Sequence, residues 1–385
     1  MQNFDLHNPT HIVFGARTVA RLDELVPTKA RVLILYGGDS ARRTGTLAEV
    51  RAALGERDVY EFGGIEPNPS YETLMRAVEL IRWEGMDFLL AVGGGSVIDG
   101  TKFVAAAVGY EGDPWEIMET HGATVRGALP FGSVLTLPAT GSEMNSGSVV
   151  SKNATKAKLV FSSPHVFPRF SILDPTKTYS LPLSQVANGV VDAFTHVMEQ
   201  YMTYPADGFV QDRFAEGLLQ TLVEIGLQVL SEPDNYNARA NLMWAATMGL
   251  NGLIAAGVPE DWSTHMIGHE LTALHGIDHA RTLAIVLPAN MEVRREAKRG
   301  KLLQYAGRVW RLTEGSEEQR IDAAIARTRM FFESLGVPTR LREYGIGASQ
   351  IGAVISQLEA HGMTALGERQ DVTLAVSRRI LEAGL

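Results

Sequence analysis

The chain has 385 residues, of which 45% are hydrophobic and 21% charged, proportions typical of a globular protein with a sizeable core. Its 35 basic and 44 acidic residues give a formal charge of −9, and no run of arginines interleaved with aromatic residues is present, which argues against a nucleic-acid groove. The absence of cysteine excludes disulfides, thiolate metal sites and cysteine nucleophiles, so any metal must be held by histidine and carboxylate.

The N-terminal segment, Met1 to Pro9, lacks the basic and apolar regions of a secretory signal peptide. No run in the chain approaches the ~18 consecutive apolar residues of a membrane span. We therefore expect a cytoplasmic protein that binds neither membranes nor nucleic acids and acts on a small molecule.

The first half of the chain alternates short apolar runs with helical patterns. Apolar runs predict buried strands at 31–36, 59–62 and 87–92, and the spacing of apolar residues predicts helices over 47–54 and 71–82. Strands that alternate with helices form a parallel sheet with right-handed crossovers. This half is therefore predicted to be an α/β domain.

The third strand runs directly into three glycines, Gly93, Gly94 and Gly95, followed by Ser96 and a helix that contains Asp99. Glycines between a strand and a helix let the backbone approach a ligand, and the helix start offers free N–H groups to a phosphate. The alternative is a capping box formed by Ser96 and Asp99 on a tight turn. The pattern differs from Gly-x-Gly-x-x-Gly, so the usual dinucleotide fingerprint is absent.

A polar loop, 138–147, follows the next predicted strand, 133–137. Its hydroxyl and amide side chains either cap turns or bind a polar ligand at the carboxyl end of the strand. Beyond it, the sequence predicts a hairpin over 149–161 and one more strand at 170–173.

The pattern changes at Leu181 and Pro182, because the longer segments downstream have helical periodicity and no strand-like alternation persists. We predict an α/β domain over 1–181 and an all-helical domain over 182–385, with a cleft between them. The predicted helices cover 185–201, 211–230, 238–253, 262–274, 283–298, 301–311, 317–335, 348–361 and 372–383.

Asp192 and His196 interrupt an otherwise apolar helix, in which positions i and i+4 share one face. Two such side chains can converge on one metal ion, since metal–nitrogen and metal–oxygen bonds are ~2.0–2.2 Å long. A buried carboxylate must be paired or must coordinate a metal. The alternative to a metal site is therefore a structural Asp–His pair in the core.

Four of the ten histidines of the chain, His265, His269, His275 and His279, fall within fifteen residues. Such a concentration of imidazole indicates metal binding, proton transfer or both. We interpret the cluster and the Asp192–His196 pair as one site. The spacing alone does not identify the ligands, because His275 precedes Gly276 and is also well placed at a helix C-terminus.

Three runs carry a resemblance to a known family: Phe-Gly-Gly-Ile-Glu-Pro-Asn-Pro at 62–69, Ala-Val-Gly-Gly-Gly-Ser-Val at 91–97 and Gln-Val-Ala-Asn-Gly-Val-Val-Asp-Ala-Phe at 185–194. With these runs the sequence resembles the iron-containing (group III) alcohol dehydrogenases over essentially its whole length. It is most similar to their NADPH-dependent aldehyde reductase and butanol dehydrogenase branch. The resemblance implies a dehydroquinate synthase-like fold, with an α/β dinucleotide-binding domain, an all-α metal-binding domain and a homodimeric assembly.

The resemblance also implies roles for individual residues. Asp192, His196, His265 and His279 correspond to the metal ligands, and imidazole with carboxylate suits either Zn²⁺ or Fe²⁺. His269 matches an additional active-site histidine, for which we predict proton donation, and His275 is left structural. The residues expected to bind the nicotinamide cofactor are Gly37, Gly38, Asp39, Ser40, Gly93, Gly94, Gly95, Ser96, Asp99, Thr136, Thr140, Asn145 and Lys158.

The implied reaction is hydride transfer between NADP(H) and a short- to medium-chain aldehyde or primary alcohol, mainly as aldehyde reduction. NADH-dependent family members carry an aspartate directly after the first sheet strand, where this chain has Gly37, and Arg42 and Arg43 are near enough to attract a 2′-phosphate. Asp39 opposes this preference if it faces the phosphate. The alternatives are an NADH-dependent polyol or lactaldehyde-type dehydrogenase, a non-redox lyase of the same fold, and an inactive nucleotide-binding sensor.

Overall fold

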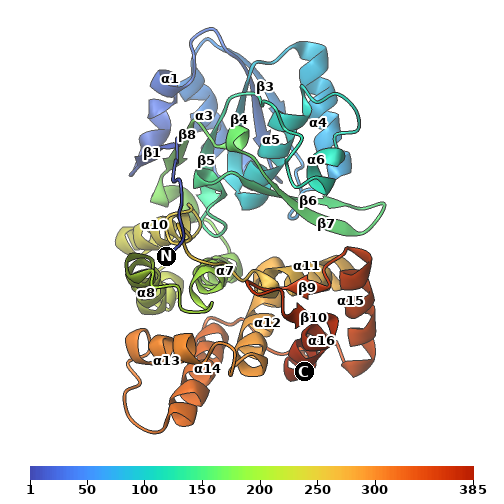
Figure 1. The fold of residues 1–385 in the computed structure, drawn as a ribbon. Helices are drawn as coiled ribbons and strands as arrows, with labels where there is room; N and C mark the ends of the chain where they lie inside the picture. Colours follow the sequence, from blue (N-terminus) through green and yellow to red (C-terminus); the bar gives the residue numbers. More distant parts are fainter. The chain divides into compact units, whose positions relative to one another are not determined.

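The computed structural model describes all residues, 1–385, and they form two compact units (Figure 1). The α/β unit comprises His7–Leu181 and Asp234–Thr247, and the helical unit comprises Met1–Leu6, Pro182–Pro233 and Met248–Leu385. The segment Asp234–Thr247 thus belongs to the α/β unit although it lies beyond the predicted boundary.

A six-stranded parallel sheet forms the centre of the α/β unit (Figure 1), with the strand order β1-β8-β5-β4-β2-β3. Parallel strands buried on both faces need continuous apolar runs, and Arg-Val-Leu-Ile-Leu-Tyr of β2 is such a run. The strands are β1 His11–Phe14, β2 Arg31–Tyr36, β3 Asp58–Phe62, β4 Phe88–Gly94, β5 Phe131–Leu137 and β8 Phe170–Leu173.

Successive side chains of each strand enter opposite cores, as the two-residue period of a strand requires. Leu33 and Leu35 of β2 pack in one core, and Val32 and Ile34 pack in the other. Helices α4 and α5 contribute to the first core, and α3 contributes to the second. The helices of this unit are α1 Leu22–Leu25, α2 Ser40–Arg43, α3 Thr46–Leu54, α4 Tyr71–Glu84, α5 Gly95–Ala107 and α6 Glu116–Glu119.

The predicted hairpin is present as β6 Gly147–Lys152 paired antiparallel with β7 Ala157–Ser162. One edge strand, β1, was not predicted, because a four-residue strand with a single buried side chain carries almost no pattern. Short 3₁₀ turns complete the unit: η1 Thr18–Arg21, η2 Ser142–Met144, η3 Pro164–Val166 and η4 Pro175–Thr178.

In the helical unit, α11, α12, α15 and α16 share an apolar core, and Phe194 of α7 packs against Phe331 and Phe332 of α14. The unit also contains a two-stranded hairpin, β9 and β10, that the sequence did not predict. None of the helices has both the length and the apolar character required to cross a membrane. Helix α10, Tyr236–Gly249, crosses the boundary, because its first twelve residues belong to the α/β unit. The other elements of the helical unit are α7 Leu183–Tyr201, α8 Phe209–Gly226, α9 Gln228–Ser231, α11 Ser263–His275, α12 His279–Val293, α13 Arg299–Arg308, α14 Glu317–Ser334, η5 Leu341–Tyr344, α15 Ala348–Ala360, β9 Ala365–Leu366, β10 Val372–Thr373 and α16 Leu374–Ala383.

Gly132 on β5 offers a test of this sheet, because a Cβ at that position would overlap the ring of Phe170 on β8. We expect Gly132→Ala to destabilise the protein by about 1–3 kcal/mol, the usual cost of an extra methyl group in a packed core. The measurement is the thermal unfolding midpoint. Gly127→Ala is the matched control, since a Cβ there meets no atom within 4 Å, and an equal midpoint for both variants would contradict the strand packing.

Candidate functional site

Helix α7 carries a row of polar side chains inside the helical unit. Most of the buried residues of this helix are apolar, but polar residues are buried as well, among them Asp192, His196, Glu199 and Gln200. Nδ1 of His196 lies 3.8 Å from Oδ1 of Asp192, as expected for positions i and i+4 of one helix. Gln200 secures this part of the helix, because its Nε2 donates to the carbonyl oxygens of His196 and Gly249, both at 2.7 Å.

Two further helices bring imidazoles to Asp192. His265 lies on α11 and His279 is the first residue of α12, which begins four residues earlier than predicted. Nε2 of His279 lies 3.6 Å from Oδ1 of Asp192. Asp192, His265 and His279 each offer one ligand atom, and these atoms lie within 4.8 Å of one another. Three helices therefore converge on one group of metal-binding atoms.

His196 and His269 border this three-residue group. The ring of His196 stacks on that of His265, with a centroid distance of 4.7 Å. The ring of His269 lies 5.2 Å from that of His279 and 6.3 Å from that of His265. The structure thus brings together the five side chains predicted as metal ligands or proton donor. His275, which was predicted to be structural, lies half-buried at the C-terminal end of α11, and burial lowers its pKa.

The chemistry of the group fits a divalent transition metal. Two ligands at ~2.1 Å with tetrahedral geometry are roughly 3.4 Å apart, close to the 3.6 Å between His279 Nε2 and Asp192 Oδ1. Imidazole and carboxylate suit both Zn²⁺ and Fe²⁺. The side chain of His279 is 23% exposed, whereas that of Asp192 is 4% exposed, so His279 is the more accessible of the two to solvent.

A buried carboxylate that the sequence reasoning missed also contacts the group. Glu199 lies seven residues after Asp192 on the same helix, and its Oε1 lies 3.1 Å from Nδ1 of His265. Burial, together with the nearby carboxylate of Asp261, raises the pKa of Glu199 well above its usual range. The i+7 spacing was a usable signal, because residues seven apart share one face of a helix.

The glycine loop, Gly93 to Ser96, joins β4 to α5 in the α/β unit. A Cβ at Gly93 would overlap Val97, and a Cβ at Gly95 would overlap the side chain of Thr140. The glycines are therefore required by the close packing of the loop itself. No side chain caps α5, and the first N–H groups of a helix are suited to binding an anion.

The capping-box alternative for Ser96 and Asp99 is wrong. Gly94 is the N-cap of α5, and the Asp99 carboxylate turns away from the helix start. It accepts hydrogen bonds from Ser142 Oγ at 2.5 Å and from the backbone N–H of Val149 at 3.0 Å. Removal from water raises the pKa of Asp99. The side chain thus ties α5 to the polar loop and to β6.

Two lysines, Lys158 and Lys102, form hydrogen bonds near the residues predicted to bind the cofactor. Lys158 on β7 donates to Oδ1 of Asn68 at 2.8 Å, and the backbone N–H of Asn68 donates to Ser96 Oγ at 3.3 Å. Lys102, which the sequence analysis did not assign, donates to Oδ1 of Asn145 at 2.8 Å. Burial lowers the pKa of Lys102 to about 8. Thr136 lies half-buried near the end of β5.

The segment after β2, Gly37 to Ser40, is accessible apart from Gly37, which packs near Ile65 and Val97. Asp39 is exposed and makes no capping hydrogen bond to α2, so it does not act as a side-chain cap there. Arg42 donates to the Tyr36 hydroxyl at 2.6 Å and to Glu61 at 2.9 Å. This arginine is therefore held beside the end of β2.

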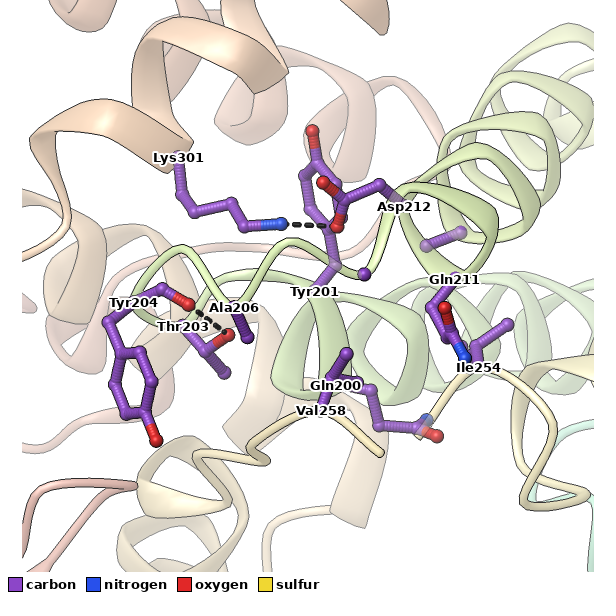
Figure 2. A pocket seen from close by; sticks show the side chains of 12 residues that line it. Gln200, Tyr201, Thr203, Tyr204, Ala206, Gln211, Asp212, Ile254, Val258 and Lys301 are labelled. Atoms are coloured by element: carbon purple, nitrogen blue, oxygen red, sulfur yellow. Dashed lines mark hydrogen bonds and ion pairs between the residues drawn. The ribbon is translucent and has the colours of Figure 1, made fainter. Parts of the chain in front are cut away.

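Figure 2 shows a separate small pocket in the helical unit, lined by residues of α7, α8 and the segment before α11. Lys301 pairs with Asp212 at this pocket, and its Nζ lies 4.5 Å from the ring centroid of Tyr201. The cavity volume is about 10 Å³, which is room for one water molecule. It is too small to admit an aldehyde, so it is not a substrate site.

Comparison with known proteins covers nearly the whole chain. Residues 9–175 match the family model for iron-containing alcohol dehydrogenase, and residues 186–371 match the C-terminal model of the same family. The chain is 62% identical over 385 residues, 100% of both chains, to the NADPH-dependent aldehyde reductase YqhD of Escherichia coli K12. The crystal structure of E. coli K-12 YqhD superposes with a TM-score of 0.99 at 61% identity, covering 100% of this chain and 99% of that one.

A second relative carries a different cofactor in its name. The probable NADH-dependent butanol dehydrogenase 1 of Bacillus subtilis is 41% identical over 367 residues, which are 94% of this chain and 95% of the relative. The names of these two relatives therefore specify different cofactors, NADPH in one and NADH in the other.

Proposed function

Because this chain belongs to the iron-containing alcohol dehydrogenase family, we infer that it is a metal-dependent, NADP(H)-linked alcohol dehydrogenase that acts mainly as an aldehyde reductase. The observation in the structure that carries this function is the convergence of Asp192, His265 and His279 from three helices, with ligand atoms within 4.8 Å of one another. The substrates are short- to medium-chain aldehydes and the corresponding primary alcohols.

We propose that Asp192, His196, His265 and His279 hold one divalent metal, Zn²⁺ or Fe²⁺. When bound, the metal supplies Lewis-acid polarisation of the aldehyde oxygen. The burial of Asp192 supports this role, because a buried carboxylate requires a compensating positive charge, which a metal ion supplies. The partial exposure of His279 leaves a side from which the aldehyde can approach.

We propose that the glycine loop and α5 bind the pyrophosphate of NADPH, which supplies the hydride. The uncapped N–H groups of α5 support this assignment, because a helix N-terminus attracts anions. Thr140 packs against Gly95, while Asn145 and Lys158 are oriented by hydrogen bonds to Lys102 and Asn68. Asp99 orders the polar loop through Ser142. The proposed cofactor residues are Gly37, Gly38, Asp39, Ser40, Gly93, Gly94, Gly95, Ser96, Asp99, Thr136, Thr140, Asn145 and Lys158.

The activity is tested by mixing the metal-loaded protein with NADPH and butanal and following cofactor absorbance. Oxidation of NADPH that depends on both butanal and metal is expected. No oxidation with butanal or longer aldehydes, from protein that contains metal, would contradict the proposed reaction. A cytoplasmic location and a homodimer are further parts of the proposal, and light scattering should give twice the mass of the chain.

We predict a preference for NADPH over NADH. The residue directly after β2 is Gly37, so no carboxylate occupies the position that would accept the ribose 2′-hydroxyl of NADH and repel a 2′-phosphate. Arg42, held by Tyr36 and Glu61, and the exposed Arg43 add positive charge nearby. The comparison is kcat/KM for the two cofactors in wild type and in Asp39→Gly. Equal or better use of NADH by wild type would contradict the prediction.

Asp39→Gly also tests where this carboxylate acts. A gain in NADPH preference would mean that Asp39 repels the 2′-phosphate, and an unchanged ratio would mean that it faces solvent. Gly38→Asp is the opposite change at the adjacent position, and a Cβ there meets no atom within 4 Å. We expect it to lower kcat/KM for NADPH more than for NADH.

A further inference from the structure

Glu199 is a fully enclosed carboxylate, with a side chain only 2% exposed, in contact with the metal-binding group. Its Oε1 accepts a hydrogen bond from the backbone N–H of His265 at 2.9 Å and lies 3.1 Å from Nδ1 of the same residue. One carboxylate oxygen therefore meets both the backbone and the ring of His265.

The contact lies at the N-terminus of α11, where the helix lacks a cap of its own. The N-cap residue, Trp262, has a φ of 60° and makes no side-chain capping hydrogen bond. Asp261 accepts from the backbone N–H of Ser263 at 2.8 Å, and Glu199 accepts from that of His265. Two carboxylates thus bind the first amides of α11, where the helix dipole favours negative charge.

The geometry also determines which nitrogen of His265 faces the metal-binding group. A carboxylate oxygen beside Nδ1 favours the tautomer with its proton on Nδ1, so the lone pair is on Nε2. Histidines that bind metals usually donate their other N–H to a carboxylate or a carbonyl, which orients the ring and increases its basicity.

The surrounding residues restrict the movement of Glu199. The backbone N–H of Asp261 donates to the carbonyl of Glu199 at 2.8 Å. Lys298 forms a buried ion pair with Asp261, and its Nζ lies 3.1 Å from Glu368 and 2.6 Å from the carbonyl oxygen of Met202. These contacts connect the end of α7, which carries Glu199, to the segment before α11, which carries His265. They therefore restrain the backbone on both sides of the Glu199–His265 contact.

We propose that Glu199 is a positioning residue of the metal centre. By accepting a hydrogen bond from the Nδ1–H of His265, Glu199 directs Nε2 toward Asp192 and His279. By capping α11, it also fixes the position of the His265 backbone and therefore of the ring. The inference rests on the proposed function, because it assumes that the group binds a metal. A purely structural role, in which Glu199 only caps α11, predicts a loss of stability with no change in metal affinity.

Glu270 on α11, the helix that carries His265, provides a control carboxylate. Its side chain is also 2% exposed, and its Oε1 contacts Nδ1 of His361 at 2.7 Å. Removal of this second carboxylate breaks a carboxylate–imidazole contact whose histidine, His361, is not a proposed ligand. It therefore serves as the control for the loss of a buried carboxylate.

The experiment measures the dissociation constant of Zn²⁺ for apo protein by competition with a chelator, and the thermal midpoint of the apo protein. Glu199→Ala is expected to weaken Zn²⁺ binding about 10–100-fold, the usual effect of losing such a partner of a ligating histidine. Glu199→Gln, which keeps an acceptor for the Nδ1–H but loses the charge, should lie between Glu199→Ala and wild type. Glu270→Ala and Glu270→Gln should bind Zn²⁺ like wild type.

Each other outcome has a definite meaning. Wild-type affinity in both Glu199 variants overturns the positioning role, whatever happens to the thermal midpoint, and so does an equal loss in the Glu270 variants. If Glu199→Ala fails to fold, the affinity of Glu199→Gln decides. If wild type and Asp192→Asn bind Zn²⁺ equally weakly, the metal centre of the proposed function fails, which is a separate result.

Discussion

Asp192→Asn is expected to abolish aldehyde reduction and to lower the metal content of the purified protein, while the fold and NADPH binding persist. Asp192 is the single carboxylate in the three-residue group, and its Oδ1 faces both His196 and His279. An amide keeps the shape of the side chain and removes the negative charge that compensates a divalent ion. The remaining donors are neutral imidazoles, so the variant has no negatively charged ligand to offset the charge of a divalent ion.

The measurement combines three readouts on one preparation: metal content, kcat with butanal, and NADPH affinity by fluorescence. His265→Ala should give the same pattern, because it removes a donor from a different helix, α11. Asp278→Asn is the control, since this carboxylate is adjacent to His279 in sequence but its side chain is 67% exposed. Normal metal content and full activity in Asp192→Asn and His265→Ala would end the metal assignment.

Elements with a strong local pattern were predicted well. The runs at 31–36 and 170–173 became strands with these bounds, because continuous apolar sequences fit a sheet that is covered on both faces. The helix bearing Asp192 and His196 was also predicted, since its apolar residues surround it nearly completely. Family resemblance then added residue roles that spacing alone had left open.

Features that depend on tertiary contacts were missed or misread. Asp99 looked like the partner of Ser96 in a capping box, but it binds Ser142 and Val149, about fifty residues along the chain. Glu199 was overlooked because its partner, His265, is 66 residues away. A local sequence pattern reports local hydrogen bonds, and these carboxylates are satisfied by distant segments.

The same limit applies to the ligand group. Spacing suggested that His265 and His269 share a helix face, and both are buried on α11. Only the packing of α12 against α11 shows that His279 joins His265 and Asp192 in the three-residue group, while His269 lies beside it. Crossings between helices are set by many side chains at once, so they cannot be derived from the position of four histidines.

His269→Ala is expected to retain the metal and to slow aldehyde reduction by ~10²–10⁴, the range typical of a lost acid–base group. Reduction of an aldehyde adds a hydride to carbon and a proton to oxygen, so the product oxygen needs a proton from water or from a nearby acid. His269 is buried, and its ring lies 5.2 Å from that of His279, the most exposed member of the three-residue group. It is therefore the histidine outside the proposed ligand set that lies nearest to the approach side.

The decisive measurement is the pH dependence of kcat for His269→Ala and for wild type, on protein with verified metal content. Loss of proton donation should lower kcat and remove the limb of the profile that reports the donating acid. His275→Ala is the matched control on the same helix, because His275 is half-buried at the C-terminal end of α11 and outside the group. Full metal content with an unchanged kcat across the pH range would assign His269 a structural role, and water would then supply the proton.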